Sequence, residues 1–90
     1  MITFDAAKDA TNRVKHGISL AEAEFADWNY ALFRPDTRKD YGEARFNALV
    51  PIRDRLYCCV YVTRNGGKRI ISLRKANQRE FDRYHARKID

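Results

Sequence analysis

Two arginines in the C-terminal half of the sequence are the side chains best suited to chemistry on a phosphate group. Arg69 and Arg74 bracket a short, mainly apolar stretch, and 12 of the 18 basic residues of the chain are arginines. A planar guanidinium binds phosphate through two parallel hydrogen bonds and does not lose its proton in proteins. These two residues could therefore stabilise the charge that develops on a phosphate during cleavage.

His16 is the first candidate for proton transfer, because imidazole gives and takes a proton near neutral pH. It follows Lys15 and precedes Gly17 at the end of a predicted helix, where the negative end of the helix dipole favours the imidazolium. The same position suits a residue that only caps the last carbonyl groups, so a structural role of His16 stays open.

Two further charged residues are candidates for supporting roles. Lys15 could pair with phosphate or be solvated. Glu43, two residues before Arg45, is either a supporting carboxylate or half of an ordinary surface pair.

Aromatic residues accompany positive charge in the second half of the chain. Residues 46–90 hold 11 basic against 4 acidic side chains, a net charge of +7, whereas residues 1–45 hold 7 against 8. Basic side chains beside exposed rings suit single-stranded RNA, which needs partners for its phosphates and its unstacked bases. An ordinary solvated sheet face, with Tyr rings under Arg stems, would have the same pattern. The candidate RNA contacts are Arg45, Tyr57, Tyr61, Lys75 and Tyr84.

The cysteines do not suggest a metal site. Cys58 and Cys59 are adjacent in an alternating apolar run, so their side chains are expected on opposite faces of a strand. Neither His16 nor His85 stands at a zinc-ligand spacing. The sequence therefore predicts reduced, packing thiols, no metal and no cofactor.

The length of the chain limits what it can be. Its 90 residues and 44% hydrophobic content predict one folded domain over residues 1–90, with a modest core. That size excludes Rossmann and barrel enzymes that enclose a large cofactor. No run of about 18 apolar residues and no secretion signal is present, so a cytoplasmic protein with no membrane contact is expected.

Local signals predict an α+β order of elements. Asp5 is expected to cap the first of two N-terminal helices and Gly17 to end it. Ser19 with Glu22 has the form of a capping box for the second helix, and Asn77 with Glu80 resembles another capping box that opens the last helix. Pro35 is expected to end a strand. The expected elements are a strand Ile2–Phe4, helices Ala6–His16 and Leu20–Asp27, a strand Tyr30–Arg34, a charged loop Asp36–Gly42, strands Glu43–Val50, Arg55–Thr63 and Lys68–Arg74, and a helix from Asn77 to about Lys88.

A hairpin around Asn65-Gly66-Gly67 sets which side chains share a face of the sheet, because side chains alternate along a strand. With Asn65-Gly66 as the loop, Val60 would lie opposite Ile71, and with Gly66-Gly67 as the loop, Val62 would; the two faces have the same members in both cases. The better core face would then carry Cys58, Val60, Val62, Arg69, Ile71 and Leu73, and the other face Tyr57, Cys59, Tyr61, Ile70, Ser72 and Arg74. This parity makes Arg74 the better candidate for direct phosphate contact, beside the tyrosines.

A set of residues spread over nearly the whole chain forms a pattern of fixed order and spacing. Its members are Phe4-Asp5, Lys8, Asn12, Lys15-His16-Gly17-Ile18-Ser19, Glu22-Ala23, Asp27, Gly42-Glu43, Arg45, Arg69-Ile70-Ile71-Ser72, Arg74-Lys75-Ala76, Glu80 and Tyr84. On these residues the sequence resembles the BrnT family of bacterial type II toxins from about Phe4 to Tyr84. Leu73 stands where a small residue is expected, in a position that concerns packing more than chemistry.

The resemblance implies a RelE-like fold, an antiparallel sheet with two N-terminal helices and one C-terminal helix. It implies a ribonuclease that arrests translation and is neutralised by a BrnA-like ribbon-helix-helix antitoxin encoded alongside. Operator DNA would be contacted only through that antitoxin. RNA carries its own nucleophile in the 2′-hydroxyl, so cleavage needs no metal.

The expected catalytic residues are Arg69 and Arg74, with His16, Lys15 and Glu43 in supporting roles. A rival hypothesis from another class is a non-catalytic basic module that binds nucleic acid or protein, such as an inactive toxin homologue acting in operon regulation. A cleavage assay with purified protein distinguishes the two.

Overall fold

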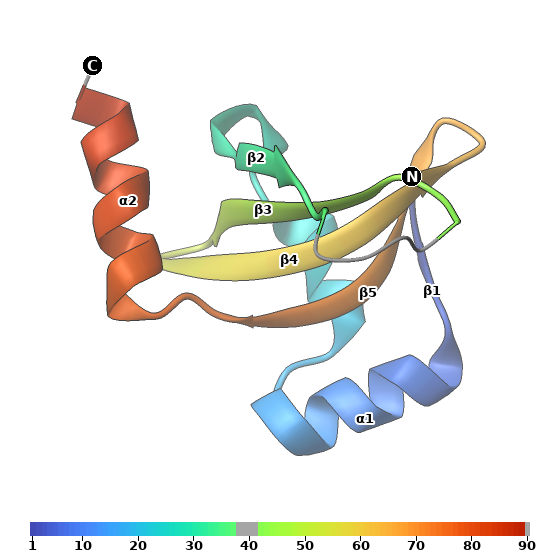
Figure 1. The fold of residues 1–90 in the computed structure, drawn as a ribbon. Helices are drawn as coiled ribbons and strands as arrows, with labels where there is room; N and C mark the ends of the chain where they lie inside the picture. The colour runs from blue at the N-terminus through green and yellow to red at the C-terminus, as the bar shows by residue number, and fades with distance from the viewer. Residues whose placement is uncertain (38–41, 90) are drawn as a thin grey trace.

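A computed structural model describes residues 1–37 and 42–89, which form an α+β fold (Figure 1). The predicted loop Asp36–Gly42 falls partly on residues 38–41, outside the described residues. In chain order the elements are β1 (Ile2–Phe4), α1 (Ala6–His16), the 3-10 helices η1 (Leu20–Phe25) and η2 (Trp28–Tyr30), β2 (Leu32–Pro35), β3 (Arg45–Ile52), β4 (Arg55–Arg64), β5 (Gly67–Lys75) and α2 (Gln78–Ile89). No helix in this described part is long and apolar enough to cross a membrane.

The sheet has five strands in the order β1-β5-β4-β3-β2. Neighbouring strands from β2 to β5 are antiparallel, but β1 pairs with β5 in parallel, with Ile2 opposite Lys68 and Phe4 opposite Ile70. The prediction of a purely antiparallel sheet is therefore wrong, and the sheet is mixed. β1 and β2 lie at opposite edges of the sheet. β1 therefore pairs with β5, which is distant in sequence, and not with the strand that follows it along the chain.

Several local predictions are confirmed. Asp5 caps α1 by accepting a hydrogen bond from the Lys8 amide, and Gly17 ends it at φ 70°. Asn65 and Gly66 form the hairpin turn, both with positive φ, as a two-residue turn of this kind requires. Each of these signals lies within a few residues of the feature that it determines.

The predicted second helix is a 3-10 helix, η1, instead of an α-helix over Leu20–Asp27. Its expected capping box does not form. The Ser19 hydroxyl donates to the Asp9 carboxylate of α1, which also accepts from the Leu20 amide at 2.7 Å, and Glu22 pairs with Arg53 instead of reaching back. Ser19 still caps η1, as predicted, because its hydroxyl oxygen accepts from the Ala21 amide at 3.1 Å, while the other bonds of Ser19 and Glu22 run to other parts of the fold.

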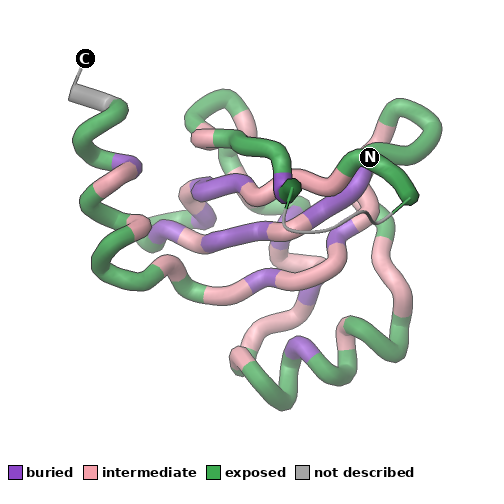
Figure 2. The backbone as a smooth tube through the Cα atoms, in the orientation of Figure 1, coloured by how far each residue is buried: buried purple, intermediate pink, exposed green. Residues whose placement is uncertain are grey.

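One face of the sheet, which we call the covered face, packs against η1 (Figure 2). Cys59, Tyr61, Ile70 and Leu73 are buried there with Leu20 of η1. The prediction of the core face is wrong, because Cys58, Val60 and Arg69 lie on the opposite face, the open face. Cys58 and Cys59 are free, buried and on opposite faces, as predicted.

A β-bulge in β5 adds a second difference, which concerns the residues that share a face beyond Ile70. Tyr61 pairs with Ile70 but Val60 pairs with Ser72, so Ile71 is an extra residue without a partner in β4. The predicted register holds as far as Ile70 and is shifted by one residue beyond it. Because side chains alternate along a strand, the shift places Ser72 and Arg74 on the open face with Cys58 instead of on the face of the tyrosines, and Leu73, predicted in the core, is buried on the covered face.

Candidate functional site

Arginines line up along the open face of the sheet. Residues directly opposite each other in neighbouring strands point to the same side. Arg34, Asn47, Val60 and Ser72 form one such row, Arg45, Val62 and Arg69 another, and Leu32, Leu49, Cys58 and Arg74 a third. At the third row α2 covers the face, where Tyr84 packs with Leu49, Leu56 and Cys58.

A cavity of about 370 Å³ lies between the open face and α2, and we call it the groove. Its wall combines three guanidinium groups with one carboxylate and a small hydroxyl. It is lined by Leu32, Arg34, Asn47, Leu49, Cys58, Val60, Ser72, Arg74, Glu80 and Arg83. Such a wall has the charge and the hydrogen-bond donors to hold a phosphate group.

Glu80 fixes Arg74 in the groove. Nη1 and Nη2 of Arg74 donate to the two carboxylate oxygens of Glu80 at 2.8 and 2.9 Å. Glu80 also accepts from the Asn77 amide, and its own amide donates to the Asn77 side chain, so the capping box predicted for α2 is present. The hydrogen bonds from Arg74 hold the pKa of Glu80 below its ordinary value, and Glu80 raises the pKa of Arg74.

One edge of the Arg74 guanidinium makes no hydrogen bond to residues 1–37 and 42–89. A guanidinium has five N–H donors. Three of them go to the two Glu80 oxygens and the Lys75 carbonyl, all from Nη1 and Nη2. The two that remain, on Nε and Nη2, lie side by side on one edge, which is the geometry that binds a phosphate with two hydrogen bonds.

Arg83 adds a buried donor to the same wall. Its Nε is buried and has no hydrogen-bond partner among the residues that the structure describes. Because this Nε is buried, the terminal nitrogens of the guanidinium are the donors that Arg83 can offer to an anion in the groove. Arg34 and Arg83 were both missed by the sequence reasoning. Only the order of the strands and the place of α2 bring them to Arg74.

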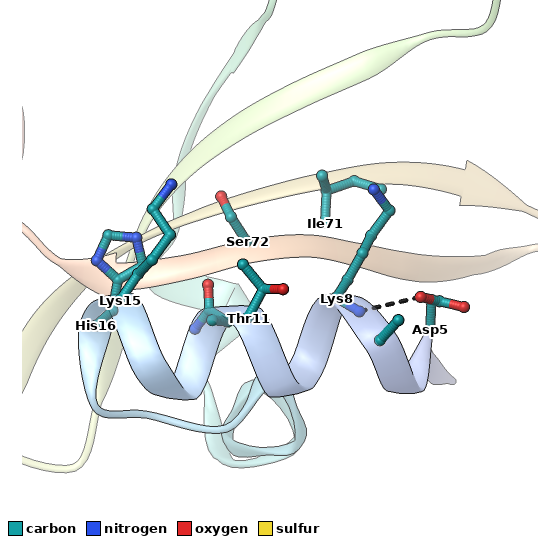
Figure 3. A pocket seen from close by; sticks show the side chains of 9 residues that line it. Asp5, Lys8, Thr11, Lys15, His16, Ile71 and Ser72 are labelled. Carbon is teal, nitrogen blue, oxygen red and sulfur yellow. Dashed lines mark hydrogen bonds between the residues drawn. The ribbon is translucent and has the colours of Figure 1, made fainter.

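His16 and Lys15 lie beside the groove, in a second cavity that we call the α1 pocket (Figure 3). Ser72 lines both cavities. The buried side chain of Asn12 holds helix α1 there. It donates to the Leu73 carbonyl at 2.8 Å and accepts from the Leu73 amide at 3.0 Å. Asn12 thus takes the place of a neighbouring strand on the edge of β5 just past the end of β1.

Glu43, Arg45 and Arg69 gather at the other end of the open face. Glu43 accepts two hydrogen bonds from Arg64, which lower the pKa of the Glu43 carboxyl, with smaller effects of Arg45 and Arg69. Arg69 lines a separate cavity beside the hairpin. The structure therefore does not bring these three residues to the groove that holds Arg74.

The predicted neighbourhood of Arg74 and the tyrosines is wrong. Tyr57 and Tyr61 belong to the covered face, where Tyr61 is only 4% exposed and its ring stacks on Phe46. Burial raises the pKa of Tyr61 to about 12. Tyr84 is also buried, and its hydroxyl donates to the Tyr30 carbonyl. The bulge at Ile71 separates Arg74 from the two strand tyrosines.

Lys75 pairs with Tyr57 and thus lies on the same side of the sheet, away from the groove, although its side chain is exposed. No group of three His, Cys, Asp or Glu side chains that could hold a metal ion occurs among residues 1–37 and 42–89.

Residues 4–80 match a model of the family described as the ribonuclease toxin BrnT of type II toxin-antitoxin systems. The chain belongs to the BrnT family. A comparison with curated proteins found no match. Membership in the BrnT family makes RNA the substrate class and an antitoxin the protein partner. The groove, with Arg34, Arg74 and Arg83 on its wall, has the chemistry that a BrnT toxin needs for the phosphates of RNA.

Proposed function

We propose that this BrnT-family toxin cleaves single-stranded RNA in the groove, with the scissile phosphate bound to Arg74. The observation that carries the proposal is that only one edge of the Arg74 guanidinium is bonded to Glu80. Glu80 holds one edge of it, and the edge formed by Nε and Nη2 is unused in those bonds. A guanidinium fixed in this way is a rigid donor pair for the charge that builds up on phosphorus.

The chemistry proceeds without a metal ion. The 2′-oxygen of the ribose attacks the neighbouring phosphorus as it loses its proton, and the bond from phosphorus to the leaving 5′-oxygen breaks as that oxygen gains one. The products are a 2′,3′-cyclic phosphate and a 5′-hydroxyl end. Arg34, Arg74 and Arg83 stabilise the extra negative charge of the pentacoordinate phosphate.

His16 is the proton-transfer group in this proposal. Glu80 and Glu43 are both held by arginines, which lower their pKa values, so neither carboxylate is suited to donate a proton near neutral pH. His16 lies in the α1 pocket, which shares Ser72 with the groove, and Lys15 next to it supports phosphate binding. Arg45 and Arg69 bind flanking nucleotides at the far end of the open face.

In the cell, this cleavage arrests translation until a BrnA-like ribbon-helix-helix antitoxin covers the toxin. The proposal rests on the family, which is a toxin of a type II system, and on the net charge of +6, which favours an acidic partner. Operator DNA is bound by the antitoxin in the complex and not by this chain alone.

Purified toxin and total RNA in the presence of a chelator test the proposal. Arg74→Ala and His16→Ala are expected to lower the cleavage rate by about 10²–10³-fold and 10²–10⁴-fold, typical losses for one electrostatic donor and for one acid-base group. Arg13→Ala is the matched control, because Arg13 pairs with Asp9 of α1, lines neither cavity, and changes the net charge equally. RNA binding without any cleavage by the unmodified toxin would instead favour the non-catalytic module. Wild-type rates for a folded Arg74→Ala variant would contradict the assignment of Arg74.

A further inference from the structure

The α1 pocket is a cavity of about 420 Å³ on the edge of the sheet beside the groove. Lys8, Thr11, Lys15 and His16 of α1 stand at helical spacing on one side of it, and Ile71 and Ser72 of β5 form the other (Figure 3). Neither lysine has an ion-pair partner in the described part of the chain. A pocket with unpaired ammonium groups, an imidazole and two hydroxyls has the chemistry to take an anion.

The two ends of the α1 pocket differ in charge. Asp5 lies at the end where α1 begins and accepts a hydrogen bond from the Lys8 amide, so a carboxylate there would repel a phosphate. Lys15 and His16 lie at the opposite end, near the Ser72 hydroxyl (Figure 3). An anion is therefore favoured at the end formed by Lys15, His16 and Ser72.

The α1 pocket and the groove are joined at the bulge of β5. The extra residue Ile71 and the following Ser72 line the α1 pocket, and Ser72 also lines the groove. Asn12 fixes α1 against the same strand one residue further along, at Leu73. An RNA strand bound in the groove can thus continue past Ser72 into the α1 pocket without leaving the surface of the protein.

We propose that the α1 pocket is a second phosphate subsite of the RNA site, in which Lys15, His16 and Ser72 bind the phosphate next to the one held by Arg74. This inference rests on the proposed function, since it takes RNA in the groove as given. If each cavity binds one phosphate, an RNA must have at least two consecutive phosphates to occupy both the groove and the α1 pocket. Lys15 in this subsite binds and positions the strand, and His16 sits where the strand passes between the two cavities.

The test compares two RNA probes that cannot be cleaved because their 2′-hydroxyls are methylated. One is a dinucleotide with a single phosphate, and the other is an oligonucleotide of about six nucleotides. Binding of each is measured at several salt concentrations to wild-type toxin and to the Lys15→Ala, Arg74→Ala and Arg13→Ala variants. Each lost phosphate contact flattens the plot of log K against log salt by about 0.7 for a single strand.

Lys15→Ala is expected to flatten the slope for the longer probe by about 0.7 and to leave the dinucleotide unchanged, whereas Arg74→Ala weakens both probes. Lys15→Arg should restore the slope, and Arg13→Ala should leave it as in the wild type. Equal slopes for Lys15→Ala and Arg13→Ala on the longer probe would overturn the subsite, as would an equal loss on the dinucleotide for Lys15→Ala and Arg74→Ala. A wild-type toxin that binds neither probe would overturn the proposed function itself, and the subsite with it.

Discussion

At the scale of single residues, the ion pair between Arg74 and Glu80 links stability to the site. Glu80 belongs to the capping box of α2 and also holds two nitrogens of the Arg74 guanidinium. The same carboxylate therefore stabilises the start of a helix and fixes the orientation of a candidate phosphate-binding group. In the proposed site, Glu80 would act on the RNA only through Arg74, which makes it a positioning residue.

Glu80→Gln separates these two roles, because glutamine can still serve in a capping box but carries no charge. We expect the free energy of unfolding to fall by about 0.5–1 kcal/mol, as for a partly exposed ion pair, and the cleavage rate to fall less than in Arg74→Ala. The pKa of Glu80 is lowered in the folded protein, so its contribution to stability is complete above its ordinary value of 4.5 and is lost as the pH falls through the folded value. The difference in Tm between wild type and Glu80→Gln should therefore be constant from neutral pH down to about pH 5 and shrink as the pH falls below 4.5. A difference that stays constant in that lower range as well would show that the pair does not set the pKa of Glu80.

At the scale of elements, the structure divides into features that local sequence predicts and features that need the whole sheet. Asp5, Gly17, the Asn65-Gly66 turn and the box of Asn77 with Glu80 each act within about four residues, and all were predicted. The bulge at Ile71 was not predicted, because no residue near it carries a bulge signal such as glycine. That one extra residue put Ser72 and Arg74 on the face of Cys58 instead of on the face of Tyr57 and Tyr61, with which they were predicted.

The candidate site shows the same division. Arg74, Lys15 and His16 were selected from the sequence, and the structure places them at two adjoining cavities. Arg34 could not be selected, because it comes from a different strand in the less basic half of the chain and reaches the groove only through the pairing of β2 with β3. The excess of basic residues in the C-terminal half therefore does not account for every arginine of the groove.

Among the contacts that join one element to another, we expect removal of the Asn12 side chain to lower the free energy of unfolding most. Its side chain makes hydrogen bonds to both backbone groups of Leu73 and to the Ile18 carbonyl, and it is 4% exposed. Asn12→Ala would leave these buried groups without partners, and each such group costs about 1–3 kcal/mol. We expect a loss of roughly 2–5 kcal/mol in urea unfolding, against less than about 0.5 kcal/mol for Val14→Ala, since Val14 is 88% exposed on the same helix. Similar midpoints for the two variants would show that α1 does not depend on Asn12 for its attachment to β5.

At the scale of the whole molecule, positive charge gathers where the proposed RNA path runs. The chain carries +6, and Arg34, Arg74 and Arg83 in the groove are continued by Arg45 and Arg69 along the open face. A surface of this kind attracts nucleic acid and acidic protein segments through the same long-range field. An antitoxin that covers the groove would therefore block the RNA phosphates by taking their place on the same arginines.

This competition predicts how the antitoxin binds. Co-expressed toxin and antitoxin should elute together in size exclusion at micromolar concentration and low salt, and RNA should not bind the complex in the groove. Since the attraction acts at long range, moderate salt should slow association more than it speeds release. Arg34→Glu, on the groove wall, should reduce the association rate by about tenfold or more, whereas Arg13→Glu on α1, with the same change in net charge, should reduce it much less. Equal effects of the two variants, measured by stopped-flow mixing, would mean that net charge alone directs the antitoxin and that the groove is not where it docks.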